Sequence, residues 1–245
     1  MAKRPYLALA QPAGSAAPEP ADTARTLIER AYAQLRHDIV EGVLAPGEKL
    51  RVEHLKARYA VGAGTLREAI TRLVSDALVV AEGQRGFRVA EMTIADLQDL
   101  TELRVHVEID ALRRSIRHGD DAWRLRLSRA FEELSAAEQP IRPENRQRWE
   151  LLNANFHEEL ISGQHSAWTL RVLRTLARHG ERYRRLSIAS PDIHRDVHAE
   201  HRELYEFAIA RKEARAALAL EAHIRNTPEQ LIRAMGVGGV AFGRT

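Results

Sequence analysis

The sequence contains no cysteine, which excludes disulfide bonds and thiolate metal ligands and fits a reducing cytoplasm. It also contains no run of about eighteen apolar residues, so no membrane-spanning helix is predicted. Pro5 and Pro12 leave too short an apolar run for a signal peptide, and residues 1–21 are predicted to form a flexible tail. The net charge is only +3, and residues 22–92 carry 11 Lys and Arg against 10 Asp and Glu. Charge alone therefore does not indicate a nucleic-acid-binding protein.

The residues that are present indicate a globular chain with two parts. At 245 residues, with 44% hydrophobic and 29% charged residues, it is long enough for one large or two ordinary domains. In the first part, apolar residues recur at every fourth position of a predicted helix: Leu27, Ala31, Leu35 and Ile39. A turn at APGEKL, a short helix RVEHLKARYA, a turn with Gly62 and Gly64, and a helix over about residues 65–76 follow. Two β-prone pieces, LVVA and FRVA, flank EGQRG and predict a hairpin.

After Met92 the strand signals stop and amphipathic helices follow one another. We predict helices over roughly residues 94–117, 121–138, 144–162, 167–188, 192–210 and 213–225, and a short one near 228–235. This pattern predicts an all-α bundle over residues 93–235 and a flexible tail at 236–245. The predicted fold class is mainly α, with a unit of three helices and a hairpin at residues 22–92 ahead of the bundle.

Two short helices joined by a tight turn form a helix-turn-helix, and the hairpin EGQRGF is then its wing. The second helix of such a motif enters the major groove of DNA and reads bases near its N-terminus, where Thr65 and Arg67 lie. On the wing, Arg85 can reach the adjacent minor groove, because Gly86 lets the backbone approach closely. A single surface arginine is more often simply solvated. The interpretation therefore depends on the ordered set of helices and hairpin.

The stretch LRVEHLKARYAVGAGTLREAITRLVSDALVVAEGQRGFRVAEMT resembles the winged helix-turn-helix of the GntR family of bacterial transcription regulators. The elements that carry the resemblance are LREAI on the second helix and QRGFRV in the hairpin. Many members have Ser/Thr-Arg-Thr before the segment equivalent to LREAI, whereas this chain has GAGT, with Ala63 in place of the first DNA-reading arginine. The resemblance implies double-stranded DNA as a partner, with thinner base readout than usual. The residues that carry over to DNA contact are Thr65, Arg67, Arg85 and Gly86.

The chain has eleven histidines, and their spacing singles out a few. Asn153 and His157 lie four residues apart, on one helical face. His201 and His223 are each eleven residues from Lys212, so in an antiparallel helix pair that turns there they lie level, roughly 16 Å along each helix. Three imidazoles and an amide oxygen from three helices can form a divalent-metal site. The alternative is that these histidines are core or surface residues with ordinary hydrogen bonds.

The helical part, from about Ile94 to Arg233, resembles the FCD ligand-binding domain of the FadR subfamily in LTELRVHVEIDAL, NANFHEEL and EHRELYEFAIARKEARAALALEAHI. Members often bind Zn, Ni or Mn through an aspartate, the histidine of the FH pair and two histidines on the last helices. The corresponding residues here are Asn153, His157, His201 and His223. An asparagine brings no negative charge, so we expect weaker metal binding or an altered metal preference. His194 and His198 share the helix of His201, and spacing alone does not exclude them.

Members with this domain commonly bind a small carboxylate that completes the metal coordination. Arg104 is our candidate for a second carboxylate anchor, since a guanidinium can hold a carboxylate at two points. The alternative is an ordinary salt bridge from Arg104 to Glu108, four residues on. GTLREAITRLVSDALVVAEGQRGFRVAEMT and NTPEQLIRAM resemble the branch that includes the carbon-starvation regulator of glutarate catabolism, which implies a dicarboxylate effector.

Together these features predict a ligand-responsive repressor that binds an inverted-repeat operator as a homodimer and is released by a small carboxylate. One alternative is a metal-free regulator that holds an anion directly with the histidines and Arg104. Another is a metal-dependent hydrolase, since three histidines with an open coordination position can activate water. Against the enzyme, no nucleophile or acid–base pair accompanies the histidines, and Glu158 points about 100° away from its neighbour His157. We therefore predict no enzymatic activity.

Overall fold

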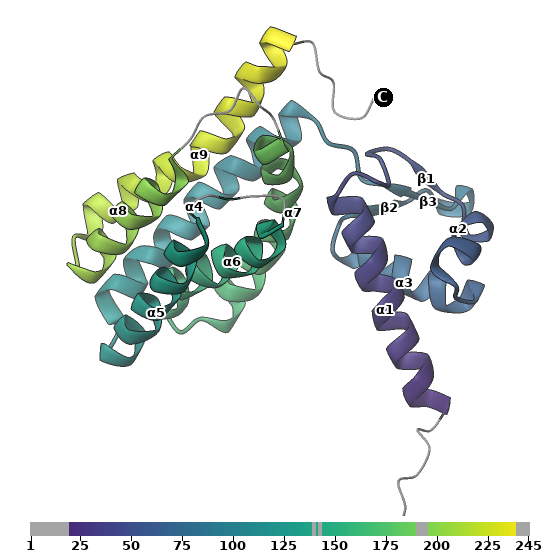
Figure 1. Cartoon of the computed structure of the whole chain (residues 1–245), viewed down its shortest axis with the longest axis horizontal. Coiled ribbons are helices and arrows are strands. Elements are labelled where there is room, and N and C mark those ends of the chain that lie inside the picture. The colour runs from purple at the N-terminus through teal and green to yellow at the C-terminus, as the bar shows by residue number, and fades with distance from the viewer. Residues whose placement is uncertain (1–19, 139–140, 142–143, 190–195, 239–245) are drawn as a thin grey trace, which may run out of the picture.

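The computed structural model describes residues 20–138, 141, 144–189 and 196–238. Figure 1 shows a small N-terminal body with a sheet and a larger helical body, joined where the chain enters the long helix α4 (Ile94–His118). Each body has its own hydrophobic core, and a small cluster around Met92, Leu97 and Tyr183 lies at the junction. No helix among the described residues is long and apolar enough to cross a membrane.

The N-terminal body contains three helices and a three-stranded sheet. Its elements are α1 (Pro20–Val40), β1 (Lys49–Leu50), α2 (Val52–Tyr59), α3 (Ala63–Ser75), β2 (Val79–Ala81), a 3-10 turn (Gly83–Arg85) and β3 (Phe87–Val89). The predicted apolar face of α1 is confirmed for Ala31, Leu35 and Ile39, which are buried in the core against α3. Leu27, the first residue of that predicted face, is 37% exposed. The described part of the predicted tail at residues 1–21 is its last two residues, which begin α1.

The predicted hairpin is confirmed: β2 and β3 pair antiparallel, with Val79 opposite Val89. The sequence analysis missed β1, which pairs with the other edge of β3, so that the strand order is β1-β3-β2. A strand of two residues is too short to show an alternating pattern of apolar residues. The turn before it needs Gly47, whose φ of +75° strains any other residue, and the carboxylate of Glu91 fills the space that a Cβ would take.

The helical body follows the predicted order of helices. Its elements are α4, α5 (Asp121–Glu138), α6 (Arg146–Ser162), α7 (Ala167–Ala189), α8 (Val197–Ile209) and α9 (Glu213–Gly238). Helix α8 begins after Asp196, whose Oδ1 accepts a hydrogen bond from the backbone N–H of Ala199 at 2.9 Å. The predicted start of this helix at residue 192 lies outside the described residues. Helices α8 and α9 form the antiparallel pair that turns near Lys212.

One helix boundary was wrong: the predicted helices 213–225 and 228–235 are a single helix, α9, with Pro228 inside it. A proline within a helix removes one backbone hydrogen bond and normally kinks or ends the helix. Here Ile224 and Leu231, on either side of the proline, are 2% and 4% exposed, and their packing holds the two halves in one element. The described part of the predicted tail at 236–245 is the last turn of α9, up to Gly238.

Candidate functional site

Helix α3 has one buried face and one exposed face. Leu66, Ile70 and Leu73 are fully buried and fix the helix in the N-terminal core. Arg67 is exposed near the start of the helix, and no ion pair involves it within the described residues. Thr65 is half-buried in the first turn. The structure therefore places both residues near the helix end where a helix-turn-helix reads bases.

The wing is the turn between β2 and β3. Its two glycines have positive φ, +57° at Gly83 and +96° at Gly86, a region in which only glycine is unstrained. Arg85 is exposed at this turn. Arg88, three residues further on in β3, is held within the domain, since its Nε donates to Glu82 at 2.8 Å and a guanidinium N–H donates to the carbonyl of Gly47. The wing thus presents Arg85 and keeps Arg88 for internal contacts.

In the bundle, three helices bring the predicted histidines together. The candidate ligand nitrogens of His157 on α6, His201 on α8 and His223 on α9 lie within 4.8 Å of one another. The ring centroids of His201 and His223 are 4.9 Å apart, so the two residues that flank Lys212 do lie level. Nitrogens bound about 2.1 Å from a tetrahedral ion lie roughly 3.4 Å apart, so an ion requires the rings to close by no more than about 1.5 Å.

Two carboxylates orient the rings of His201 and His223 through hydrogen bonds to Nδ1. Glu138 accepts a hydrogen bond from Nδ1 of His201 at 2.6 Å, and Glu200 accepts one from Nδ1 of His223 at 2.8 Å. A proton on Nδ1 makes Nε2 the nitrogen that carries the lone pair, which is the arrangement that carboxylates give to metal-binding histidines. Sequence reasoning missed both carboxylates. Glu138 lies 63 residues from His201, too far for any spacing signal.

The strongest sign that this cluster accepts a cation is an unsatisfied nitrogen. His201 is 0% exposed, and its Nε2 has no hydrogen-bond partner within the described residues. A buried polar atom without a partner is costly, and such atoms call for an explanation. A divalent ion bound by the three histidines would satisfy this nitrogen, so the donor set fits a metal such as Zn, Ni or Mn.

The charges around the cluster also suit metal binding. Burial, and next the neighbouring His223 and His201, lower the pKa of His157 well below its usual range, so its ring is neutral at pH 7. Burial alone would raise the pKa of Glu138, but hydrogen bonds from His201, Trp149 and His198 outweigh it and lower the pKa. The cluster therefore offers a neutral imidazole and a supporting carboxylate, the protonation states that metal binding needs.

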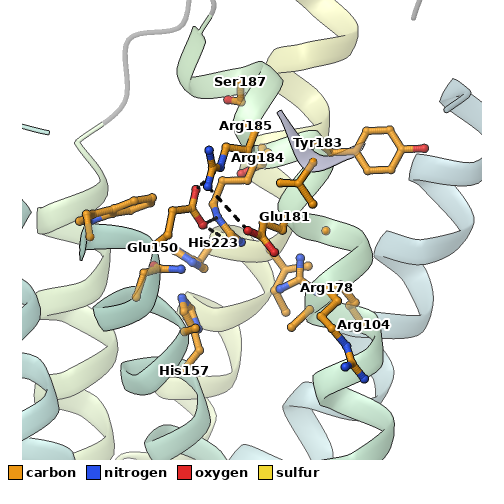
Figure 2. A pocket seen from close by; sticks show the side chains of 18 of the residues that line it. Arg104, Glu150, His157, Arg178, Glu181, Tyr183, Arg184, Arg185, Ser187 and His223 are labelled. Carbon is orange, nitrogen blue, oxygen red and sulfur yellow. Dashed lines mark hydrogen bonds and ion pairs between the residues drawn. The ribbon is translucent and has the colours of Figure 1, made fainter. Parts of the chain in front are cut away.

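A cavity of about 940 Å³ adjoins the histidines and runs towards the N-terminal body. Asn153, His157 and His223 line it, and Asn153 is 3% exposed, one turn before His157 on α6. The predicted fourth residue thus shares the cavity with two of the three histidines. The cavity is rich in arginine: Arg36, Arg104, Arg174, Arg178, Arg184 and Arg185 all line it. Several of these are held by ion pairs, as with Glu150, which pairs with Arg184 at 2.9 Å and Arg185 at 3.3 Å (Figure 2).

Arg104 lines the cavity, and it also makes the salt bridge that the sequence left open as an alternative. Its Nε lies 2.7 Å from Oε1 of Glu108, and both side chains are largely buried. Its guanidinium rests against α7 at Gly180, where a Cβ would lie 3.2 Å from Nη1. In the view of Figure 2, Arg104 of α4 lies beside Arg178 and apart from His157. Arg104 therefore both lines the cavity and pairs with Glu108.

His198 lies one turn from His201 on α8, but it is not one of the three clustered histidines. Its Nδ1 pairs with the second oxygen of Glu138 at 3.1 Å, and its ring stacks with Phe131 at 6.4 Å between centroids. His198 therefore supports the carboxylate, outside the cluster of His157, His201 and His223. His194 lies outside the described residues.

Comparison with known proteins matches both parts of the chain. Residues 27–89 match the family described as bacterial regulatory proteins, gntR family, and residues 99–226 match the FCD domain. The HTH-type transcriptional regulator BphR of Paraburkholderia xenovorans (strain LB400) is 42% identical over 217 residues, covering 86% of this chain and 88% of BphR. The HTH-type transcriptional repressor GlaR of Escherichia coli (strain K12) is 32% identical over 212 residues, covering 82% of this chain and 94% of GlaR.

Solved structures agree in fold. The crystal structure of a GntR transcriptional regulator from Rhodococcus sp. RHA1 covers 85% of this chain and 99% of its own, with a TM-score of 0.67 and 22% identity. The McbR/YncC protein of E. coli has a TM-score of 0.66 at 17% identity, covering 85% of this chain and 98% of its own. These two likenesses concern the fold alone.

Proposed function

This chain belongs to the GntR family of bacterial transcription regulators, with an FCD domain behind its winged helix-turn-helix, and we propose that it is a repressor released by a small carboxylate bound beside a metal ion. The relatives and the fold are those of regulators, rather than enzymes. The observation that carries the proposal is the buried Nε2 of His201, which has no partner within the described residues and faces two further histidines. The relative GlaR is a transcriptional repressor, which supports repression here.

DNA binding uses α3 and the wing. Arg67 and Thr65 contact the major groove, and Arg85 with Gly86 contacts the neighbouring minor groove. A homodimer presents two such units, so its two-fold symmetry calls for an inverted-repeat operator. Ala63 offers no hydrogen bond to a base, so the remaining contacts carry the sequence preference.

His157, His201 and His223 hold the metal, with the amide oxygen of Asn153 as a fourth donor. All four donors are uncharged, so this site binds a divalent ion more weakly than one with a carboxylate ligand. When bound, the ion supplies positive charge and an open coordination position for a carboxylate oxygen. The arginines of the cavity, Arg104 among them, give a second carboxylate of the same effector a place to bind, which favours a dicarboxylate.

The proposal is tested with full-length protein purified without a nickel column. Metal content is measured by mass spectrometry, and thermal unfolding is followed with dicarboxylates of three to six carbons, with and without added Zn, Ni or Mn. We expect a dicarboxylate to raise the melting temperature only when metal is present, because a ligand of the folded state stabilises it by about 2.7 kcal/mol at 100 times its Kd. An equal rise after removal of metal would instead support a regulator that holds the anion directly with its histidines and arginines.

A further inference from the structure

Helix α7 lines the cavity and faces α1 of the DNA-binding domain (Figure 1). Its residues Arg178 and Arg184 line the cavity. The same turns of the helix reach across to the N-terminal body, where Arg36 pairs with Glu181. This segment is therefore in contact with both the effector side and the DNA side of the molecule.

Several contacts of α7 meet at the C-terminal end of α3, the recognition helix of the helix-turn-helix. Asp76 is the residue that directly follows α3, and its side chain is 17% exposed. Nε2 of His179 donates to the carbonyl oxygen of Asp76 at 2.8 Å, and Nη1 of Arg178 lies 3.5 Å from the Asp76 carboxylate. The hydroxyl of Tyr32, on α1, donates to the same carboxylate at 2.5 Å. The C-terminal end of α3 is thus held from two domains at once.

Helix α7 also contacts the chain directly after the wing hairpin. A guanidinium N–H of Arg182 donates to the carbonyl oxygen of Ala90 at 2.9 Å, and Arg182 is 4% exposed. Ala90 directly follows β3, so the bonds at Asp76 and Ala90 bracket the hairpin that forms the wing. The chain from Ala90 to α4 is short, and Met92 within it packs against Tyr183 of α7.

We propose that Arg178, His179 and Arg182 are positioning residues for DNA binding: they set the orientation of the recognition helix and wing from a helix of the bundle. This inference rests on α3 and the wing being the DNA-reading elements. Both DNA-binding units of a dimer must present their helices at the spacing of two half-sites. Holding the end of α3 to the bundle removes rotational freedom that otherwise has to be lost on binding DNA.

The absence of cysteine allows a direct measurement of this orientation. Exposed residues on each body, Glu53 and Asp121, are replaced with cysteine for a pair of spin labels, and labelled chains are diluted with unlabelled protein so that distances within one chain dominate. We expect one narrow distance distribution for the parent protein. The double variant Arg178→Ala/His179→Ala is expected to broaden it, whereas Arg178→Lys/His179→Gln keeps a cation and a donor and is expected to preserve it.

DNA affinity is measured in parallel on a genomic duplex selected by the parent protein. The double alanine variant is expected to bind about three- to tenfold more weakly, because one hydrogen bond and one partly exposed ion pair to Asp76 are lost, and the Lys/Gln variant to bind as the parent does. Arg171→Ala is the matched control, since Arg171 is an exposed arginine two turns earlier on α7 that lies over the ring of Trp168 and is outside the cavity lining. Unfolding followed by circular dichroism confirms that each variant is folded.

Three results would overturn the inference: an unchanged distance distribution in the double alanine variant, DNA affinity within twofold of the parent or tighter, or equal effects from Arg171→Ala. Should the parent protein select no duplex at all, the proposed function fails, while the spin-label distances still decide whether the bundle orients the recognition helix.

Discussion

The proposed DNA-reading surface, with Arg67 and Arg85, and the histidine cluster differ in burial and in charge pairing. Arg67 and Arg85 are exposed and make no ion pair within the described residues, whereas His201 is fully buried against Glu138, itself 6% exposed. A surface cation can be removed without leaving an unsatisfied partner behind. A buried histidine or carboxylate cannot, because its partner then loses its hydrogen bond in a place that water does not reach. Substitutions should therefore separate function from stability in the first site and link them in the second.

The largest expected effect is at Glu138. Glu138→Gln keeps the shape of the side chain but weakens its hold on Nδ1 of His201, and we expect zinc affinity to fall about 10- to 100-fold, as for other carboxylates behind metal-binding histidines. Isothermal titration of metal-free protein measures the affinity. Glu133→Gln, an exposed carboxylate on the same helix, serves as the control. An unchanged affinity in Glu138→Gln would show that the cluster does not depend on this carboxylate.

At the DNA surface, Arg67→Ala should act on function alone. Loss of a bidentate base contact costs about 1–3 kcal/mol, so we expect affinity for the operator to fall at least fivefold. Because Arg67 is exposed, the melting temperature should stay within a degree or two of the parent. Arg114→Ala, an exposed arginine of the bundle, is the matched control in a gel-retardation assay. Full affinity in Arg67→Ala would exclude this residue from base or phosphate contact.

Asn153→Asp tests the departure from the metal-site pattern of the family. A carboxylate in place of the amide adds a charged ligand, so we expect zinc affinity to rise about tenfold. In the absence of metal, the same change buries an unpaired charge at a position that is 3% exposed, so the free energy of unfolding should fall by about 1–3 kcal/mol. Chemical denaturation with and without zinc measures both effects. A carboxylate that changes neither quantity would place residue 153 outside the metal site.

The smallest expected effect is a pH dependence at the contact between α7 and Asp76. Burial lowers the pKa of His179 in the folded protein, so the unfolded state takes up the proton more readily. His179 therefore contributes its full stability above a pH of about 6.5, and this contribution is lost as the pH falls below that value. The free energy of unfolding should thus decline less steeply between about pH 6.5 and 5 in His179→Gln than in the parent. Identical slopes would contradict this assignment.

Much of the fold could be predicted from the sequence because helices and turns depend on residues that are close together along the chain. The period of apolar residues marks the helices, and APGEKL and EGQRG mark the turns. The errors arose where the signal was weak or where packing overrode it. Strand β1 has two residues, and Pro228 normally ends a helix but here lies between the buried Ile224 and Leu231.

The spacing of residues by itself determined that His201 and His223 face each other, because two antiparallel helices convert equal distance from a turn into equal height. It also placed Thr65 and Arg67 near the tip of the recognition helix. Only the tertiary structure decided which carboxylates stand behind the histidines and which bundle residues hold Asp76. Those partners lie tens of residues away along the chain, and no local pattern encodes a contact that forms only when separate helices pack together.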